Sequence, residues 1–378
     1  MSKPKPHAPN WIPVNKPYIA PNAAAYVNDA LNSQWLSPGG PMARAFAEKL
    51  GEYVGGKAVL VNSGTSALEM AIRAAARVYG KTSGSIIVPT YTCPDCAIAV
   101  IKAGFRPVFA DIDEQFFSLT ATTLEPLLKG VRDVVGVMIV HLYGIAALPS
   151  IYDMCRAHGL FIVDDVAEGL GVRPGGHNLL DLTDVAITSL RGEKPLPVGT
   201  GGVVMTRHEG IEGLVKSMVG LNSPGAFNRY YTVDMAYSYE FPETLAALGL
   251  AQLEVYPQMV QARRQLDAHY QTTIFGETDD SELDDTDVPW KFPVVVDDSR
   301  EAWAAARQAG VEVSPPHWPL HQLPFLRDCH AKTQAVSKWT LEAAEWAHEH
   351  IVAYPLWPGM DDEQIERVVA QIEFSRSK

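Results

Sequence analysis

Three short segments of the sequence carry residue types that could do chemistry together. The first, Asn62-Ser-Gly-Thr-Ser-Ala-Leu68, ends a strand-like run and begins a helix-like one. Backbone N–H groups at a helix start attract anions, and Gly64 allows a ligand to approach the backbone closely. Gly64 and Thr65 are therefore candidates for an anion cradle. Taken alone, the motif is equally typical of a capped helix that binds nothing.

The second segment is Phe161-Ile-Val-Asp-Asp165-Val-Ala-Glu168. It places an acidic residue at the carboxyl end of a strand, where a parallel sheet faces its ligand crevice. A carboxylate at Asp165 could keep a pyridine nitrogen protonated, which makes the ring an electron sink. Without the other segments, an aspartate that caps the next turn would be the simpler interpretation.

The third segment, Ser189-Leu-Arg-Gly-Glu-Lys194, precedes a glycine-rich turn at Gly199-Thr-Gly-Gly202. A lysine just beyond a strand end and surrounded by small residues is suited to a Schiff base, and the Ser189 hydroxyl could join the anion cradle. A single lysine is usually a solvated surface residue. The three segments in this order, however, indicate a pyridoxal phosphate (PLP) site held by Lys194.

Composition limits the kind of protein that carries these segments. A chain of 378 residues fits a large domain plus a smaller one. The formal net charge of −13 disfavours nucleic-acid binding, although local cations and helix starts still bind phosphates. The four cysteines are too sparse for a disulfide scaffold. We see neither a signal-peptide core nor an apolar run that could span a bilayer, so we expect a cytoplasmic protein without a membrane partner.

The elements that must position these segments alternate along the chain. Residues 41–206 read as alternating helices and strands, typical of a mainly parallel α/β sheet. Strands are expected at 85–90, 107–112, 134–141, 160–165, 184–190 and 203–206, and helices at 65–79, 94–103 and 149–158. Thr65 or Ser66 is the expected cap of the first of these helices.

A long helix and a second α/β unit follow. Residues 243–275 predict one long helix that bridges two domains. In residues 287–378 we expect strands near 291–297, 311–314 and 351–355, and helices at 299–309, 336–349 and 361–376. The prolines at 4, 6, 9 and 13 predict an extended N-terminal arm.

The sequence resembles the DegT/DnrJ/StrS family of PLP-dependent sugar aminotransferases. The likeness runs from Ile12-Pro-Val to Trp318-Pro-Leu-His321 through the three segments above. It also includes Asn32-Ser-Gln-Trp-Leu-Ser-Pro-Gly-Gly, Val88-Pro-Thr-Tyr-Thr, Pro107-Val-Phe-Ala-Asp-Ile-Asp, His141-Leu-Tyr-Gly and Ala247-Leu-Gly-Leu-Ala-Gln-Leu-Glu. The resemblance implies an α/β protein of PLP-dependent transferase fold type I. In this fold we expect a large domain (1–258, with the arm) that contains a seven-stranded, mainly parallel sheet flanked by helices. A smaller C-terminal α/β domain (259–378) is expected to follow it.

The resemblance also assigns roles to residues. It implies that Lys194 carries the cofactor, Asp165 pairs with the pyridine nitrogen, and Glu168 lies against the ring oxygen. Phosphate contacts fall to Gly64, Thr65 and Ser189, and to Ser238 reaching into the partner subunit of a homodimer. The substrate pocket is bordered by His321, and Trp318 either borders it as well or packs in the small-domain core.

Several positions depart from the family pattern. Cys93 stands where an aromatic residue usually stacks on the ring, and Ser238 where Asn is common. Glu240 replaces an Arg expected to bind the donor carboxylate, while Arg191 has replaced an aromatic residue. A guanidinium suits planar carboxylate binding, so Arg191 could take over that role. An Arg191–Glu240 ion pair that only shapes the pocket is the equal alternative.

Cys93-Pro-Asp-Cys96 also fits a redox or zinc motif at a helix start. A zinc site needs two further ligands, and no paired Cys or His motif exists elsewhere in the chain. We therefore expect no metal and a packing role at the cofactor face.

The predicted function is transfer of an amino group from an amino acid, with L-glutamate the expected donor, to a nucleotide-linked keto sugar. Three alternatives remain beside it. A cyclitol aminotransferase would share the cofactor site, and a catalytically silent homologue would bind the cofactor or a sugar nucleotide for regulation. The family's dehydratases carry His in place of the Schiff-base lysine, so Lys194 argues against that branch.

Overall fold

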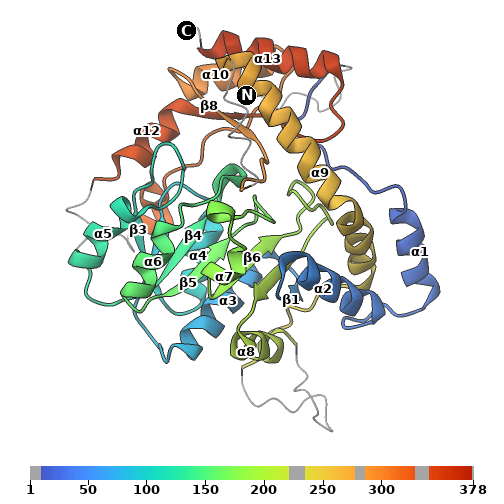
Figure 1. Ribbon diagram of the computed structural model, residues 1–378, viewed down its shortest axis with the longest axis vertical. Coiled ribbons are helices and arrows are strands. Elements are labelled where there is room, and N and C mark those ends of the chain that lie inside the picture. Colours follow the sequence, from blue (N-terminus) through green and yellow to red (C-terminus); the bar gives the residue numbers. More distant parts are fainter. Residues whose placement is uncertain (1–9, 221–234, 277–285, 328–339, 377–378) are drawn as a thin grey trace.

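The computed structural model describes residues 10–220, 235–276, 286–327 and 340–376, and its centre is a seven-stranded sheet (Figure 1). The strand order is β1-β7-β6-β5-β4-β2-β3. Neighbouring strands from β6 to β3 are parallel, whereas β7 is antiparallel to both β1 and β6. The predicted mainly parallel, seven-stranded sheet is confirmed. Its strands are β1 (Lys57–Val61), β2 (Ser85–Pro89), β3 (Arg106–Ala110), β4 (Val134–Val140), β5 (Phe161–Asp165), β6 (Val185–Ser189) and β7 (Gly202–Thr206).

Helices cover both faces of this sheet, so β2, β5, β6 and β7 are buried along their whole length. Alternate strand residues enter two separate hydrophobic cores, as Phe161 and Ile162 of β5 illustrate. One core includes apolar residues of α3 (Gly64–Val78), α4 (Pro94–Lys102) and α8 (Glu209–Val219). The other includes those of α2 (Pro41–Val54), α5 (Ala121–Gly130), α6 (Ser150–Ala157) and α7 (Leu179–Leu182).

A single long helix, α9 (Glu243–Phe275), connects this domain to the rest of the chain. In Figure 1 it runs from α1 (Ala23–Asn32) and α2 to α13 (Asp362–Arg376). Val260 still packs in the core of the large domain, whereas Leu266 and Tyr270 belong to a third core. That change of core supports the division that we propose at residue 258.

The third core lies under a two-stranded antiparallel sheet of β8 (Phe292–Val295) and β9 (Ile351–Tyr354). Helix α10 (Ser299–Gln308) lies beside β9, and α12 (Glu342–His350) runs directly into that strand. The predicted strand at 311–314 is wrong, because Val311 and Ser314 form only isolated bridges, to Ile12 and Ala353. Positions 336–339 of a predicted helix and prolines 4, 6 and 9 lie outside the described residues.

No helix in the described ranges combines the length and apolarity that crossing a membrane requires.

Candidate active site

The predicted anion cradle is the start of α3. The cap of this helix is Ser63, whose Oγ accepts a hydrogen bond from the Ser66 amide at 3.0 Å, and neither predicted cap holds that position. A Cβ added at Gly64 would lie 3.1 Å from the Ser189 Cβ, and one at Gly202 would lie 2.3 Å from the Ser63 carbonyl oxygen. Side chains at these two glycines would fill the cradle, which explains why the sequence needs glycine there.

A cavity of about 430 Å³ opens at this helix start and at the carboxyl ends of β4, β5 and β6. Its wall gathers most of the residues that the sequence singled out, from segments far apart in the chain. These are Gly64, Thr65, Cys93, Asp165, Glu168, Ser189, Arg191 and Lys194, and they are joined by Ser63, Thr92, Asp95, His141, Glu193, Thr200, Trp290, Lys291, Ser314 and His317.

Lys194 forms an ion pair with Glu168, with its Nζ 3.0 Å from Oε1, and its side chain is only 14% exposed. The Tyr143 amide donates to the other oxygen of Glu168 at 2.9 Å, so this carboxylate is fixed from two sides. Burial opposes both charges, but their attraction outweighs it. The pKa of Glu168 is therefore lowered and that of Lys194 is raised.

Asp165 and Asp164 point to opposite sides of β5, because successive strand residues alternate. Asp164 Oδ1 accepts hydrogen bonds from His141 Nε2 and from the Tyr152 hydroxyl, both at 2.7 Å, and Asp164 is not part of the cavity wall. Asp165 borders the cavity and accepts from the Ala167 amide at 2.9 Å. Burial raises its pKa above the ordinary aspartate value, while the Ala167 amide and the nearby Lys194 ammonium act in the opposite direction.

The surroundings of Cys93 and Cys96 do not favour a reactive thiolate, and the packing role at the cofactor face stays a prediction. Burial raises the pKa of Cys93 to about 11 and that of Cys96 well above the usual thiol range. Cys96 Sγ donates to Asp165 Oδ2 at 3.4 Å. A raised pKa disfavours the thiolate on which thiol exchange depends. Within the described ranges, no group of three metal-ligating side chains exists.

The sequence did not predict the part of the cavity wall that comes from residues 290–317. Trp290 and Lys291 stand just before β8, and Ser314 and His317 precede a short turn (Leu320–Gln322). Burial lowers the pKa of His317 to about 4, so the ring is neutral. The sequence offered one signal, the lysine inside Val288-Pro-Trp-Lys291, because a lysine beside an apolar strand needs a partner or a ligand.

The alternative Arg191–Glu240 ion pair is not formed within the described chain. Arg191 Nε lies 3.0 Å from Glu193 Oε1, and the arginine side chain is 63% exposed at the mouth of the cavity. Glu240 lines a different hollow together with Lys216 and Gly220.

Three further predicted residues lie outside this chain's cavity wall. His321 Nδ1 lies 2.9 Å from Thr90 Oγ1 and its Nε2 3.0 Å from Glu345, so both ring nitrogens already have partners and His317 takes the wall position. Trp318 is 48% exposed and packs on His348, so it is not a core aromatic. The Ser238 carbonyl accepts from Asn62 Nδ2 at 3.5 Å, beside the helix start.

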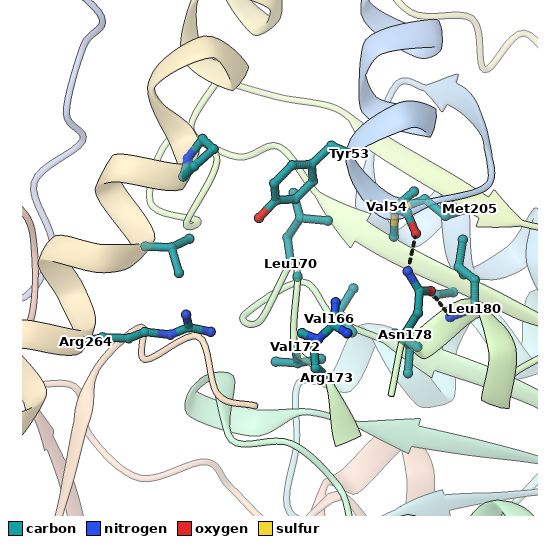
Figure 2. A pocket seen from close by; sticks show the side chains of 15 residues that line it. Tyr53, Val54, Val166, Leu170, Val172, Arg173, Asn178, Leu180, Met205 and Arg264 are labelled. Atoms are coloured by element: carbon teal, nitrogen blue, oxygen red, sulfur yellow. Dashed lines mark hydrogen bonds between the residues drawn. The ribbon is translucent and has the colours of Figure 1, made fainter. Parts of the chain in front are cut away.

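A second and larger cavity, about 520 Å³, is lined by Val166 and Leu170 among others (Figure 2). Arg173, Arg264 and the Tyr53 hydroxyl face an otherwise mostly apolar lining of residues such as Leu170. The residues that line it include no lysine and no carboxylate. The chemistry therefore belongs to the smaller cavity.

The residues of the smaller cavity fit PLP. The helix start with Gly64, Thr65 and Ser189 has the donors and the room that a phosphate group requires. Asp165 is a buried acid on the cavity wall that forms no ion pair within the described residues, and it could therefore accept a pyridinium partner. Lys194 supplies a buried amine for the covalent link.

Comparison with known proteins agrees with this chemistry. The model of the DegT/DnrJ/EryC1/StrS aminotransferase family matches residues 17–373. GDP-perosamine synthase of Vibrio cholerae is 29% identical over 370 residues, covering 94% of this chain and 97% of that protein. The UDP-N-acetyl-3-dehydro-alpha-D-glucosamine 3-aminotransferase of Acidithiobacillus ferrooxidans is 27% identical, covering 82% of each.

Among solved structures, the fold matches Helicobacter pylori PseC, an aminotransferase of pseudoaminic acid biosynthesis. The TM-score is 0.86 at 20% identity, over 97% of this chain and 99% of that one. The predicted fold type I, the PLP cofactor and the sugar-aminotransferase family are thereby confirmed. The chain belongs to the DegT/DnrJ/EryC1/StrS aminotransferase family and is a PLP-dependent aminotransferase.

Proposed function

We propose that this enzyme moves an amino group from an amino-acid donor, with L-glutamate as the expected one, to the keto group of a nucleotide-linked sugar. The observation that carries the proposal is the convergence of Lys194, Asp165 and Glu168 on one cavity that begins at the α3 helix start. Two relatives support the nucleotide-linked acceptor, because their names specify a GDP sugar and a UDP sugar.

Each residue of this cluster has a distinct task in the proposed mechanism. PLP, when bound, supplies an electron sink for the charge left on a carbon that loses a proton. Lys194 would hold the cofactor, and its Nζ, when free, would move that proton as a general base. Glu168 keeps the amine within the cavity through the 3.0 Å ion pair. Asp165 holds the proton on the pyridine nitrogen.

We also propose that a partner subunit completes each active site. The resemblance places Ser238 at the phosphate of a neighbouring active site, and this segment lies beside the α3 start of its own chain through Asn62. Two such segments exchanged across a two-fold axis would complete two sites at once, which is how we expect the homodimer to be built.

A substrate panel tests the proposed acceptor. Aminated enzyme would be mixed with keto-sugar nucleotides, with the same keto sugars lacking the nucleotide, and with a keto cyclitol, while cofactor absorbance is followed. We expect return of the PLP spectrum with at least one keto-sugar nucleotide and much slower return with the free sugars. Fastest return with the cyclitol would replace the proposal with the cyclitol alternative. Normal cofactor binding without reaction on any amino donor would favour the silent homologue.

A further inference from the structure

Lys291 is a second amine in the active-site cavity, and the mechanism above does not use it. The Lys194 and Lys291 ammonium groups both lie on the Trp290 ring, 4.3 and 3.8 Å from its centroid. The two nitrogens are therefore no farther apart than the sum of these distances, about 8 Å. Because both amines line one cavity, Lys291 is within reach of a charged group attached at the reacting carbon.

The charges of the cavity leave Lys291 as the cation available to a ligand. Lys194 is paired with Glu168, and Arg191 is paired with Glu193 at the exposed rim. Lys291 Nζ donates to the Ser314 hydroxyl at 2.9 Å, and within the described chain no carboxylate lies at ion-pair distance from it. A partly buried ammonium with a neutral partner favours an anionic ligand.

The substrates of an enzyme with the proposed function bring three anionic groups into the active site, which are the α- and γ-carboxylates of glutamate and the diphosphate of the nucleotide sugar. The γ-carboxylate is separated from the reacting carbon by two methylene groups. The α-carboxylate of an amino acid is bonded to the same carbon as the amine that reacts. The diphosphate of a nucleotide sugar is attached to the anomeric carbon, away from the keto carbon. We propose that Lys291, oriented by Ser314, binds the α-carboxylate of the amino donor, a proposal that rests on the aminotransferase function above.

The surroundings of Lys291 make this contact dependent on pH. Burial, together with the nearby Lys194 ammonium, lowers the pKa of Lys291 to about 8 against the opposing effect of Glu168, Glu193 and Glu312. Lys291 is therefore cationic below about pH 8 and loses its charge above it. Donor affinity should fall as the pH rises through that value, because the neutral amine no longer attracts a carboxylate.

Binding of α-methylglutamate to the PLP-loaded enzyme tests the proposal without requiring turnover. This ligand has the α-carboxylate but no α-hydrogen, so it binds and cannot complete the transfer. In calorimetric titrations, Lys291→Met should weaken its binding about 10- to 100-fold, the scale of a charge-assisted hydrogen bond. Lys291→Arg should recover part of the loss. Lys129→Met, on an exposed face of α5, should change nothing.

The second arm compares the two half-reactions through cofactor absorbance. Lys291→Met should slow amination by L-glutamate at limiting donor and leave amination by the α-amide of glutamate unchanged, since the amide carries no charge there. Reaction in the reverse direction with the amino-sugar nucleotide should be unaffected. The donor half-reaction needs no acceptor, so it tests Lys291 even if every keto-sugar nucleotide fails.

Three results would overturn the proposal. If Arg191→Leu weakens binding of α-methylglutamate and Lys291→Met does not, the α-carboxylate is bound by Arg191. If Lys291→Met slows only the half-reaction with the amino-sugar nucleotide, Lys291 binds the nucleotide diphosphate. If Lys291→Met slows both half-reactions equally, the role of Lys291 is structural only. If Lys291→Met does not bind PLP, the same comparison can be made with Lys291→Arg and Ser314→Ala. We expect Ser314→Ala to weaken the binding of α-methylglutamate several-fold.

Discussion

At the scale of single residues, Lys194 is the position whose loss has the clearest outcome. Borohydride should fix PLP covalently on one lysine of the native enzyme, and Lys194→Ala should abolish that link because the remaining cavity amine, Lys291, is placed by Ser314 and Trp290 instead. Peptide mapping after reduction checks this. Label recovered on a different lysine of the native enzyme would show that the cofactor site is assigned wrongly.

Glu168 should set the pH at which Lys194 accepts the cofactor. Only a neutral amine attacks the cofactor's carbonyl, and Glu168 raises the pKa of Lys194 against the opposing effect of burial. Covalent reconstitution of the apoenzyme should therefore accelerate as the pH rises. In Glu168→Gln the same profile should move to lower pH, because the raising charge is gone. Glu193→Gln is the matched control at the rim, and a profile moved equally by both variants would contradict this assignment.

The sequence predicted some of these residues and not others for a physical reason. Asp165, Ser189 and Lys194 follow the ends of neighbouring strands, and such ends meet at one edge of any parallel sheet. Lys291 comes from irregular chain just before β8, and His317 from irregular chain before the turn at Leu320–Gln322, where no period fixes the direction of a side chain. The choice between His317 and His321 depended on which ring the Thr90 and Glu345 side chains hold, and sequence does not show that.

At the scale of elements, β7 lies so close to the start of α3 that no side chain fits at Gly202. Gly202→Ala places a Cβ 2.3 Å from the Ser63 carbonyl oxygen, so we expect destabilisation of about 1–3 kcal/mol and weaker PLP binding. Gly213→Ala in the interior of α8 meets open space and should stabilise by about 0.4–1 kcal/mol. Denaturant unfolding and PLP titration of the two variants measure the contrast, and equal stabilities would refute the packing argument.

Elements with a strong period were predictable, and those held by single contacts were not. The helix predicted at 243–275 has the bounds of α9, and the predicted helix at 94–103 differs from α4 by one residue. The expected strand at 311–314 ends at Pro315-Pro316, and its residues find one partner each instead of a ladder. The cap of α3 was misplaced because Ser63, Thr65 and Ser66 are all good capping residues and only the backbone selects one.

At the scale of the whole molecule, we expect a homodimer in which Ser238 of one subunit completes the phosphate site of the other. Sedimentation should show a dimer at enzyme concentrations that support activity. Mixing a Lys194→Ala subunit with a Ser238→Trp subunit should restore one working site per mixed dimer, because one of its two sites then contains neither change. An active monomer, or the absence of restored activity in a verified mixed dimer, would contradict shared sites.

The antiparallel pairing of β1 with β7 sets the order in which this enzyme can form during synthesis. β1 leaves the ribosome early, but its partner, Gly202–Thr206, emerges only after five other strands of the sheet. The α3 start and Gly202 therefore cannot meet until nearly the entire large domain has been translated. Pairings this distant along a chain form slowly. Because the proposed phosphate site is formed by this contact, we expect PLP to bind only after the contact has formed. Its binding free energy would then stabilise the finished domain and no earlier folding intermediate.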